Sequence, residues 1–154
     1  ASIGFLIYNF NPASSFMGDM GSMVLGFLLA VLAIKLDFRV PAERQVVTWM
    51  IPVVVLGLPI FDTTLVTITR LWEGRSPMVG GKDHTSHRLT TLGLSQRAAV
   101  LVLYVVCVAL GFTGVQLSHA SIEEGLAIGV ALAVAALMAF AFLTWAYRRN
   151  QRGA

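Results

Sequence analysis

The chain has 154 residues, of which 56% are hydrophobic and 12% are charged. A soluble domain typically carries about twice that charged fraction, so the composition excludes an ordinary soluble domain and indicates an integral membrane protein. The net charge of +3 does not indicate nucleic-acid binding, because the basic residues flank apolar segments. The single cysteine, Cys107, cannot form an intrachain disulfide.

Four apolar segments predict membrane-spanning helices, at about 21–36, 46–69, 98–117 and 124–147. The last three are long enough to cross a hydrocarbon core of about 30 Å at about 1.5 Å per residue. Pro52 and Pro59 predict a kink in the second helix. Glycine and alanine in 125–136 predict close helix packing. We therefore expect an all-α fold, a polytopic membrane bundle with four transmembrane helices and a loop at 70–97.

The basic residues predict how these helices are oriented. The loop at 70–97 contains five lysines and arginines, and the tail after 147 contains three. If the helices alternate, both segments lie on one side of the membrane, which the positive-inside rule places in the cytoplasm. The first helix then begins on that side, so we expect Asp19 and the loop to share one membrane face. On the opposite side, Ser121 and Glu124 predict a capping box.

Asp19 lies in the stretch FMGDMGSMVLGFLLA (16–30), where the first long apolar segment begins. A carboxylate suits a hard cation such as Mg²⁺, and a helix N-terminus with nearby glycine amides suits phosphate. The alternative is a carboxylate that caps the helix and complements its dipole. The residues alone favour the cap, because no Gly-Lys-Ser/Thr phosphate-binding loop follows.

A second polar cluster lies in the loop, in the stretch KDHTSHRL (82–89). It comprises Lys82, Asp83, His84, His87 and Arg88. The two histidines would share a face if this stretch is helical, but two histidines and one aspartate without cysteine are a weak zinc signal. Phosphate recognition fits better, because ammonium, guanidinium and imidazole groups can all donate to phosphate oxygens. The alternative is a solvated loop whose charges only set the topology.

Two further features of the sequence bear on this loop. Gly80 and Gly81 precede the cluster and would let the backbone approach a ligand closely. Asp62 lies in the second apolar segment, and a carboxylate within a membrane helix suggests a functional site. The alternative for Asp62 is a position near the interface with a hydrogen bond to Thr63, Thr64 or a neighbouring helix.

Two linked stretches of the sequence are NFNPASSFMGDMGSMVLGFLLA (9–30) and IPVVVLGLPIFDTTLVTITRLWEGRSPMVGGKDHTSHRL (51–89). Together they resemble the polyprenyl-phosphate N-acetylhexosamine-1-phosphate transferases. This family includes undecaprenyl-phosphate GlcNAc-1-phosphate transferases and phospho-MurNAc-pentapeptide translocases. The resemblance implies that 1–154 is the C-terminal part of a single membrane transferase domain. It also implies transfer of a phospho-sugar, with GlcNAc-1-phosphate expected, from a UDP-sugar to polyprenyl phosphate with release of UMP. Such a reaction starts cell-envelope glycan synthesis at the cytoplasmic face of the bacterial cytoplasmic membrane.

The resemblance also implies roles for individual residues. Asp19 corresponds to a catalytic aspartate that binds Mg²⁺, with Mn²⁺ as the alternative metal. His84 and His87 correspond to catalytic histidines near the nucleotide-sugar phosphates. The family often has His-x-His-His there, whereas Ser86 stands at the middle histidine of this chain, so a role that needs three imidazoles is not carried over.

The remaining polar residues receive weaker assignments. Lys82, Asp83 and Arg88 are expected to bind substrate phosphate, and Asp62 corresponds to an aspartate often present in the family helix, without an assigned role. The family also carries an Asp-Asp motif and an Asn/Asp-rich motif that these 154 residues lack. We therefore expect this fragment alone to be inactive.

The expected partners are the UDP-sugar, polyprenyl phosphate and membrane lipids, with a homodimer as a further possibility and no nucleic acid. Two other functions are compatible with the residues. A transporter or channel would use Asp62 as an intramembrane ion site. A membrane scaffold would use the basic loop only to bind anionic lipids.

Overall fold

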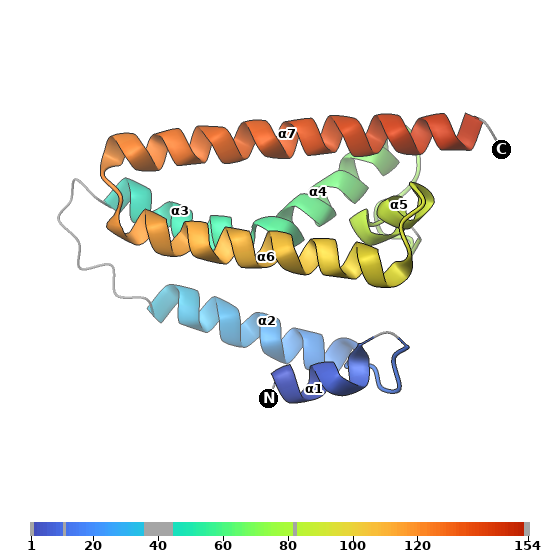
Figure 1. Cartoon of the computed structure of the whole chain (residues 1–154), viewed down its shortest axis with the longest axis horizontal. Helices are drawn as coiled ribbons and strands as arrows, with labels where there is room; N and C mark the ends of the chain where they lie inside the picture. Colours follow the sequence, from blue (N-terminus) through green and yellow to red (C-terminus); the bar gives the residue numbers. More distant parts are fainter. Residues whose placement is uncertain (1, 11, 36–44, 82, 153–154) are drawn as a thin grey trace. The chain divides into compact units, whose positions relative to one another are not determined.

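The computed structural model describes residues 2–10, 12–35, 45–81 and 83–152. This part of the chain contains helices and no strand (Figure 1). The helices are α1 (Ser2–Asn9), α2 (Gly18–Lys35), α3 (Gln45–Val55), α4 (Gly57–Trp72), α5 (Thr85–Thr91), α6 (Gln96–His119) and α7 (Ile122–Arg152). The all-α fold predicted from the sequence is confirmed.

Three of the described helices are long and apolar enough to cross a membrane: α2, α6 and the Ile122–Asn150 part of α7. The pair formed by α3 and α4 is a fourth candidate, although its two halves are bent by 68°. Large apolar side chains on these helices are exposed, among them Phe27, Val105 and Leu137. Such exposure is expected where a helix faces lipid, so the prediction of a polytopic membrane bundle is confirmed.

The apolar segment predicted as one helix over 46–69 is divided into α3 and α4. The chain leaves helical geometry at Leu56, and α4 begins at Gly57. Pro59 explains the break, because it has no N–H to donate to the carbonyl of Val55 and its ring collides with that carbonyl in a continuous helix. Pro52 lies inside α3 without ending it. The predicted kink is therefore confirmed, as a complete interruption of the helix.

The described residues form two compact units, one within 1–39 and the other within 40–154. The first contains α1 and α2, and the second contains α3 to α7. In the second unit α3 packs against both α6 and α7 (Figure 1). Helix α5 also contacts α6 and α7, and the Asn150 side chain donates a hydrogen bond to the carbonyl of Thr91 at 2.9 Å. The loop after α4 and the end of α7 thus lie at the same end of this unit.

The core of the second unit is small and lies between α3, α6 and α7. Val47, Val54, Leu117 and Ala120 form its buried cluster. Glycines allow the helices to approach one another: a Cβ atom at Gly125 would lie 2.5 Å from a methyl group of Val47. Close packing in this region, which the small residues predict, is therefore present at the start of α7.

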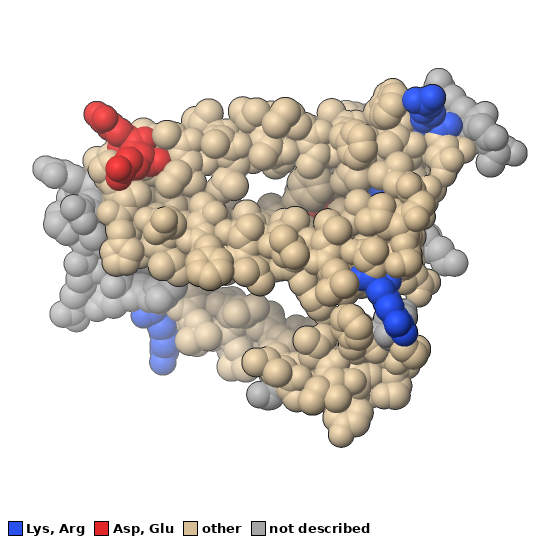
Figure 2. All heavy atoms as spheres, viewed as in Figure 1, with Lys and Arg blue, Asp and Glu red and all other residues tan. Residues whose placement is uncertain are grey.

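Charges are segregated along the second unit. Glu123 and Glu124 lie in the first turn of α7, and Figure 2 shows acidic atoms over the α6–α7 turn. The Ser121 amide donates to the Glu124 carboxylate at 2.9 Å, and the Glu124 amide donates to the Ser121 hydroxyl at 3.3 Å. These two bonds confirm the predicted capping box. Basic atoms lie over the opposite end of α7 (Figure 2), where Arg148 and Arg149 occur.

The contact between α3 and α6 can be tested at a glycine of α6. A Cβ atom at Gly114 would lie 2.7 Å from Cγ2 of Val55, whereas one at Gly111 would meet nothing within 4 Å. Replacing Gly114 by alanine is expected to destabilise the protein by about 1–3 kcal/mol, because a branched side chain must move. Gly111→Ala is the matched control and should be neutral or stabilising through its helix propensity. Thermal unfolding in detergent would measure both, and equal melting temperatures would contradict this packing.

Candidate active site

The first predicted site residue, Asp19, lies in the first turn of α2. Gly18 has φ +65°, a left-handed conformation that favours glycine. A Cβ atom at Gly21 would lie 2.3 Å from Cγ of Met17, so the methionine folds back only because residue 21 has no side chain. The glycines of the motif therefore shape the turn that presents an exposed Asp19. No residue in the described part of the chain hydrogen-bonds or pairs with its carboxylate.

The second site lies where α4 meets α5, and its centre is the Asp62 carboxylate. Oδ1 of Asp62 accepts hydrogen bonds from the amide and the hydroxyl of Thr85, each at 2.6 Å. Oδ2 lies 2.7 Å from Nδ1 of His84. Thr85 is the first residue of α5, and the amides of a first helical turn have no partner within their helix. Asp62 therefore supplies the acceptor that the Thr85 amide lacks within α5. The Asp62 carboxylate therefore caps the N-terminus of α5 and fixes the orientation of the His84 ring beside it.

This contact determines what His84 can do chemically. An ionised carboxylate only accepts hydrogen bonds, so Nδ1 of His84 carries the proton that it donates to Asp62. The other ring nitrogen, Nε2, does not take part in this bond, and the side chain of His84 is 50% exposed. A neutral ring can accept a proton at Nε2, and a protonated ring can donate from Nε2 to an anion. Asp62 thus holds His84 in one tautomer with Nε2 available to a ligand.

The loop before α5 is organised around a buried ion pair. Nη2 of Arg70 lies 2.8 Å from Oδ2 of Asp83, and the two side chains are only 4% and 7% exposed. Nε of Arg70 donates to the same oxygen at 2.9 Å, and Nη1 donates to the carbonyls of Pro77 and Val79. Arg75 contacts both Asp83 oxygens at 3.3 Å. The Arg70 bonds tie the end of α4 to the loop at three positions, and the Arg75 contacts join two residues within the loop.

Charge and burial act in opposite directions on Asp83. Burial raises the pKa of this carboxyl, but hydrogen bonds and charges from Arg75 and Arg70 outweigh it and hold the pKa below its usual value. Hydrogen bonds to Glu73 and Asp83 raise the pKa of Arg75 above its usual range. Asp83 and Arg75 are therefore charged at neutral pH, and the Asp83 carboxylate already has two cationic partners.

Arg88 lies inside the loop rather than on its surface. Its Nε donates to the backbone carbonyl of Asp83 at 2.9 Å, its Nη2 donates to the hydroxyl of Thr69 at 2.7 Å, and its Cζ lies 4.8 Å from the ring centre of Tyr147. Burial lowers the pKa of Arg88. Only Nη1 has no hydrogen-bond partner among the described residues. These contacts indicate that Arg88 holds α4, α5 and α7 together.

The structure places the other predicted residues less completely. His87 is exposed on α5, while His84 precedes the helix as its N-cap, so the two histidines flank the first turn of α5. Lys82 lies outside the described residues. Gly81 does allow a close backbone approach, as predicted, but to the ion pair: a Cβ atom there would lie 2.6 Å from Nη2 of Arg70. Asp19 belongs to the first unit and the loop to the second. That Asp19 and the loop lie on the same membrane face therefore stays a prediction.

The fit of Mg²⁺ to these residues depends on which carboxylates are free. Within the described ranges, no group of three or more histidine, cysteine or acidic side chains could hold a metal ion. Asp62 and Asp83 already bind protein donors, so Asp19 is the described aspartate best able to bind a metal. A single carboxylate is compatible with Mg²⁺, which keeps several water ligands and often shares substrate phosphates. Asp19 therefore fits as one ligand of such a site.

Comparison with known proteins identifies related membrane enzymes. The family model for glycosyl transferase family 4 matches residues 1–37. A Bacillus subtilis protein described as a probable undecaprenyl-phosphate N-acetylglucosaminyl 1-phosphate transferase is 38% identical over 122 residues, which cover 79% of this chain and 33% of the relative. The decaprenyl-phosphate N-acetylglucosaminephosphotransferase of Mycolicibacterium smegmatis is 37% identical over 113 residues, 68% of this chain and 28% of the relative. The predicted family resemblance is confirmed.

A shorter match extends to another branch of these polyprenyl-phosphate sugar-1-phosphate transferases. The phospho-N-acetylmuramoyl-pentapeptide-transferase of Staphylococcus carnosus is 52% identical over 40 residues, 26% of this chain and 12% of the relative. The chain spans about a third of the length of the first two relatives. No solved structure matches the chain.

Two features of this candidate site were not predicted from the sequence. Arg70 and Arg75 were counted only as topology signals, although they hold the loop through Asp83. Thr85 was not selected, although it connects α5 to Asp62. The contact of Arg70 and Arg75 with Asp83 does have a signal in the sequence, because an aspartate among several basic residues in one loop favours an ion pair. Nothing in the local spacing identifies Thr85, which lies 23 residues from Asp62.

The ion pair predicts how the loop responds to loss of the Asp83 charge. Asp83→Asn leaves Arg70 buried without a counter-ion, which typically costs about 3–5 kcal/mol. We expect faster amide hydrogen exchange in the loop and α5 at pH 7, with α6 unchanged. Glu73→Gln is the matched control, since it removes only the exposed partner of Arg75, and should leave the exchange nearly unchanged. Equal protection in Asp83→Asn and the wild type would contradict the role of this pair.

The lowered pKa of Asp83 also gives the pH dependence of the wild-type loop. A carboxyl with a lower pKa in the folded state stabilises that state above its ordinary pKa of 3.8. This contribution is lost as the pH falls below that value and through the folded-state pKa. Amide exchange, corrected for its intrinsic pH dependence, should therefore show constant loop protection from pH 7 to 5 and a loss below about 3.8 that Asp83→Asn does not show.

Proposed function

We propose that this chain forms part of an enzyme that transfers GlcNAc-1-phosphate from UDP-GlcNAc to a polyprenyl phosphate and releases UMP. The B. subtilis and M. smegmatis relatives are described as transferases of N-acetylglucosamine phosphate that act on a polyprenyl phosphate, and the B. subtilis protein aligns with 79% of the chain. The observation that carries the proposal is the Asp62–His84 contact, because it presents an imidazole nitrogen from a loop rich in cations. Figure 1 shows α5, which follows His84, at one end of the second unit.

The reaction brings two anionic phosphates together, so the site must neutralise negative charge. We propose that Asp19 binds Mg²⁺, which would offset the charge of the sugar-nucleotide pyrophosphate and of the departing UMP. Lys82 and His87 would bind phosphate oxygens, as imidazole and ammonium groups readily do. The loop residues Arg70, Arg75 and Asp83 would keep these groups in position.

His84 would act directly on the phosphates through Nε2. In its protonated form Nε2 donates a hydrogen bond to a phosphate oxygen, and in its neutral form Nε2 accepts a proton from the acceptor phosphate. Asp62 would be a positioning residue, because its bond to Nδ1 fixes both the tautomer and the orientation of the ring. Arg88 and Asp83, predicted as phosphate-binding residues, are better proposed as positioning residues because their polar groups contact the protein.

The contacts of Asp62 also disfavour the transporter or channel. An intramembrane ion site needs carboxylate oxygens that face a cavity, whereas both oxygens of Asp62 accept bonds from α5 and its N-cap. We further propose that the loop faces the cytoplasm at the bacterial cytoplasmic membrane. Arginines gather at the loop end of the second unit, whereas Glu123 and Glu124 lie in the first turn of α7 at the other end, and this excess of basic residues on the loop side supports the orientation (Figure 2).

The proposed transfer can be tested in the full-length protein that carries this chain. We expect UMP release from UDP-GlcNAc in the presence of polyprenyl phosphate and Mg²⁺, and its loss with EDTA. Asp19→Asn should lower the turnover at least about 100-fold, because the ligand charge is removed. The isolated 154-residue chain should be inactive. Full UMP release by Asp19→Asn would overturn the metal assignment, and preference for another UDP-sugar would overturn the assignment of GlcNAc.

The positioning role of Asp62 can be separated from a purely structural one by a double-mutant cycle. Asp62→Asn should lower kcat about 10–100-fold, as loss of an orienting carboxylate usually does. In a His84→Ala background the same change should have almost no further effect, because it acts through the imidazole. Thr64→Val is the matched control on α4, since its hydroxyl donates only to the carbonyl of Ile60 among the described residues. Additive losses in the double variant would exclude this coupling.

A further inference from the structure

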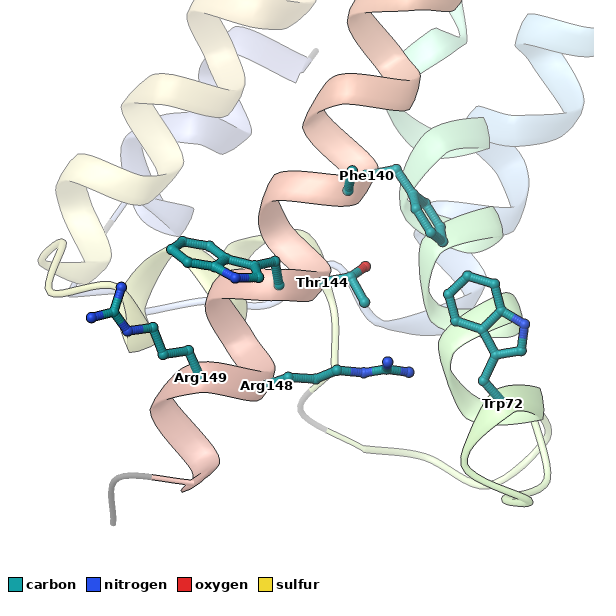
Figure 3. Close-up of a pocket in the computed structure, with 7 residues that line it drawn as sticks. Trp72, Phe140, Thr144, Arg148 and Arg149 are labelled. Atoms are coloured by element: carbon teal, nitrogen blue, oxygen red, sulfur yellow. The ribbon is translucent and has the colours of Figure 1, made fainter.

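A groove of about 550 Å³ lies beside the C-terminal part of α7, apart from the residues proposed for transfer. Its lining comprises Trp72 of α4 and, from α7, Phe140, Ala141, Thr144, Trp145, Arg148 and Arg149. Figure 3 shows that Phe140, Thr144 and Arg148 face Trp72, while Arg149 lies on the other side of α7. The side that faces α4 therefore combines aromatic, hydroxyl and cationic groups.

The spacing in α7 arranges these groups along a polarity gradient. Residues four apart lie above one another on a helix, so Phe140, Thr144 and Arg148 follow each other along one face. The Phe140 ring meets the Trp72 ring edge-on at a centroid distance of 5.8 Å, and Cζ of Arg148 lies 5.7 Å from the Trp72 ring centre. One end of the face is thus apolar and the other is cationic, which matches an amphiphile with an anionic head.

The middle of this gradient contains a polar group without a partner. Thr144 is only 8% exposed, and its hydroxyl forms no hydrogen bond with any residue in the described part of the chain. Figure 3 shows its oxygen on the side of the groove that faces Trp72. A buried hydroxyl left unpaired is unfavourable, so an acceptor oxygen of a ligand would stabilise it. This observation points to a ligand independently of the arginines.

The position of the groove in the membrane identifies the class of ligand. The apolar span of α7 ends at Asn150, just after the arginines, and α4 ends at Trp72. Tryptophan and arginine together at the end of a span are typical of the level of the lipid headgroups. Basic pockets between membrane helices at this level bind anionic lipid headgroups. Trp72 and Trp145 are 62% and 57% exposed, as expected for side chains in contact with lipid.

We propose that this groove binds the phosphate of an anionic membrane phospholipid. Arg148 pairs with the phosphate, the Thr144 hydroxyl donates to one of its oxygens, and an acyl chain lies against Phe140 and Trp72. Because Trp72 closes α4, just before the loop that holds His84, the bound lipid fixes α7 against α4 on the side of the bundle that faces the membrane. The proposal uses only this groove and does not depend on the transfer reaction.

The site can be tested by lipid binding to the purified full-length protein. Native mass spectrometry in detergent would follow titration with dioleoylphosphatidylglycerol, with dioleoylphosphatidylcholine as the zwitterionic reference. Arg148→Gln should weaken phosphatidylglycerol binding about fivefold, as expected for one arginine at a membrane surface. Thr144→Val keeps the side-chain shape and should weaken binding about fivefold through one lost hydrogen bond. Neither change should alter the weak binding of phosphatidylcholine.

A matched control separates this groove from general attraction to a basic surface. Arg97→Gln removes the same charge from the start of α6, outside the groove, and should leave phosphatidylglycerol binding unchanged. If Arg148→Gln unfolds the protein, Thr144→Val and Arg148→Lys provide the test, and Arg148→Lys should retain most of the binding. An equal loss in Arg97→Gln, or unchanged binding in Thr144→Val, would overturn the site.

Two competition experiments distinguish the sources of the phosphate. Millimolar inorganic phosphate should not displace phosphatidylglycerol, because it lacks the acyl chains that contact the aromatic rings. One equivalent of undecaprenyl phosphate should also fail to displace it. Displacement by free phosphate would reduce the groove to a simple anion site, and displacement by the polyprenyl lipid would make it an acceptor site, so either result overturns the proposal. The readout is lipid bound, which stays informative even if the proposed transferase activity is absent.

Discussion

The buried ion pair between Arg70 and Asp83 is the interaction on which the rest of the loop depends. It attaches the last turns of α4 to residues that are thirteen positions further along the chain. The Arg70 guanidinium also binds two loop carbonyls, and Gly81 is accommodated only because it has no side chain next to this pair. Two buried charges are unfavourable unless each is well paired, so the loop has few alternative conformations that satisfy them. The pair thereby holds the loop that leads into α5.

A single carboxylate then connects the membrane helix to the chemistry proposed for the loop. Asp62 reaches α5 because the chain bends at Pro59 and α4 departs from the line of α3 by 68°. In one continuous helix, this side chain would project along a different direction from the bundle. The break in the membrane helix, the cap of α5 and the orientation of His84 are therefore parts of one arrangement. Arg88 stabilises this arrangement through its hydrogen bond to Thr69 of α4 and its contact with the Tyr147 ring of α7.

Features that depend on local sequence could be predicted, and features that depend on folding the loop could not. Apolar length identified the membrane helices, Pro59 identified the kink, and Ser121 with Glu124 identified the capping box, because each signal acts over a few residues. The two loop histidines stay a prediction as site residues, and the contact of His84 with Asp62 spans 22 residues and leaves no periodic signature. Arg88 resembled a solvated cation by composition, whereas three helices enclose it. Long side chains with several donors can serve either role, and only the packing distinguishes them.

The hydrogen bond from Asn150 to the carbonyl of Thr91 has a practical meaning for anyone who prepares this protein. It joins the Asn150 side chain, near the end of α7, to the last residue of α5, the short helix that follows His84. A label or surface attachment made at Asn150 would therefore remove a contact of the helix that follows the candidate site.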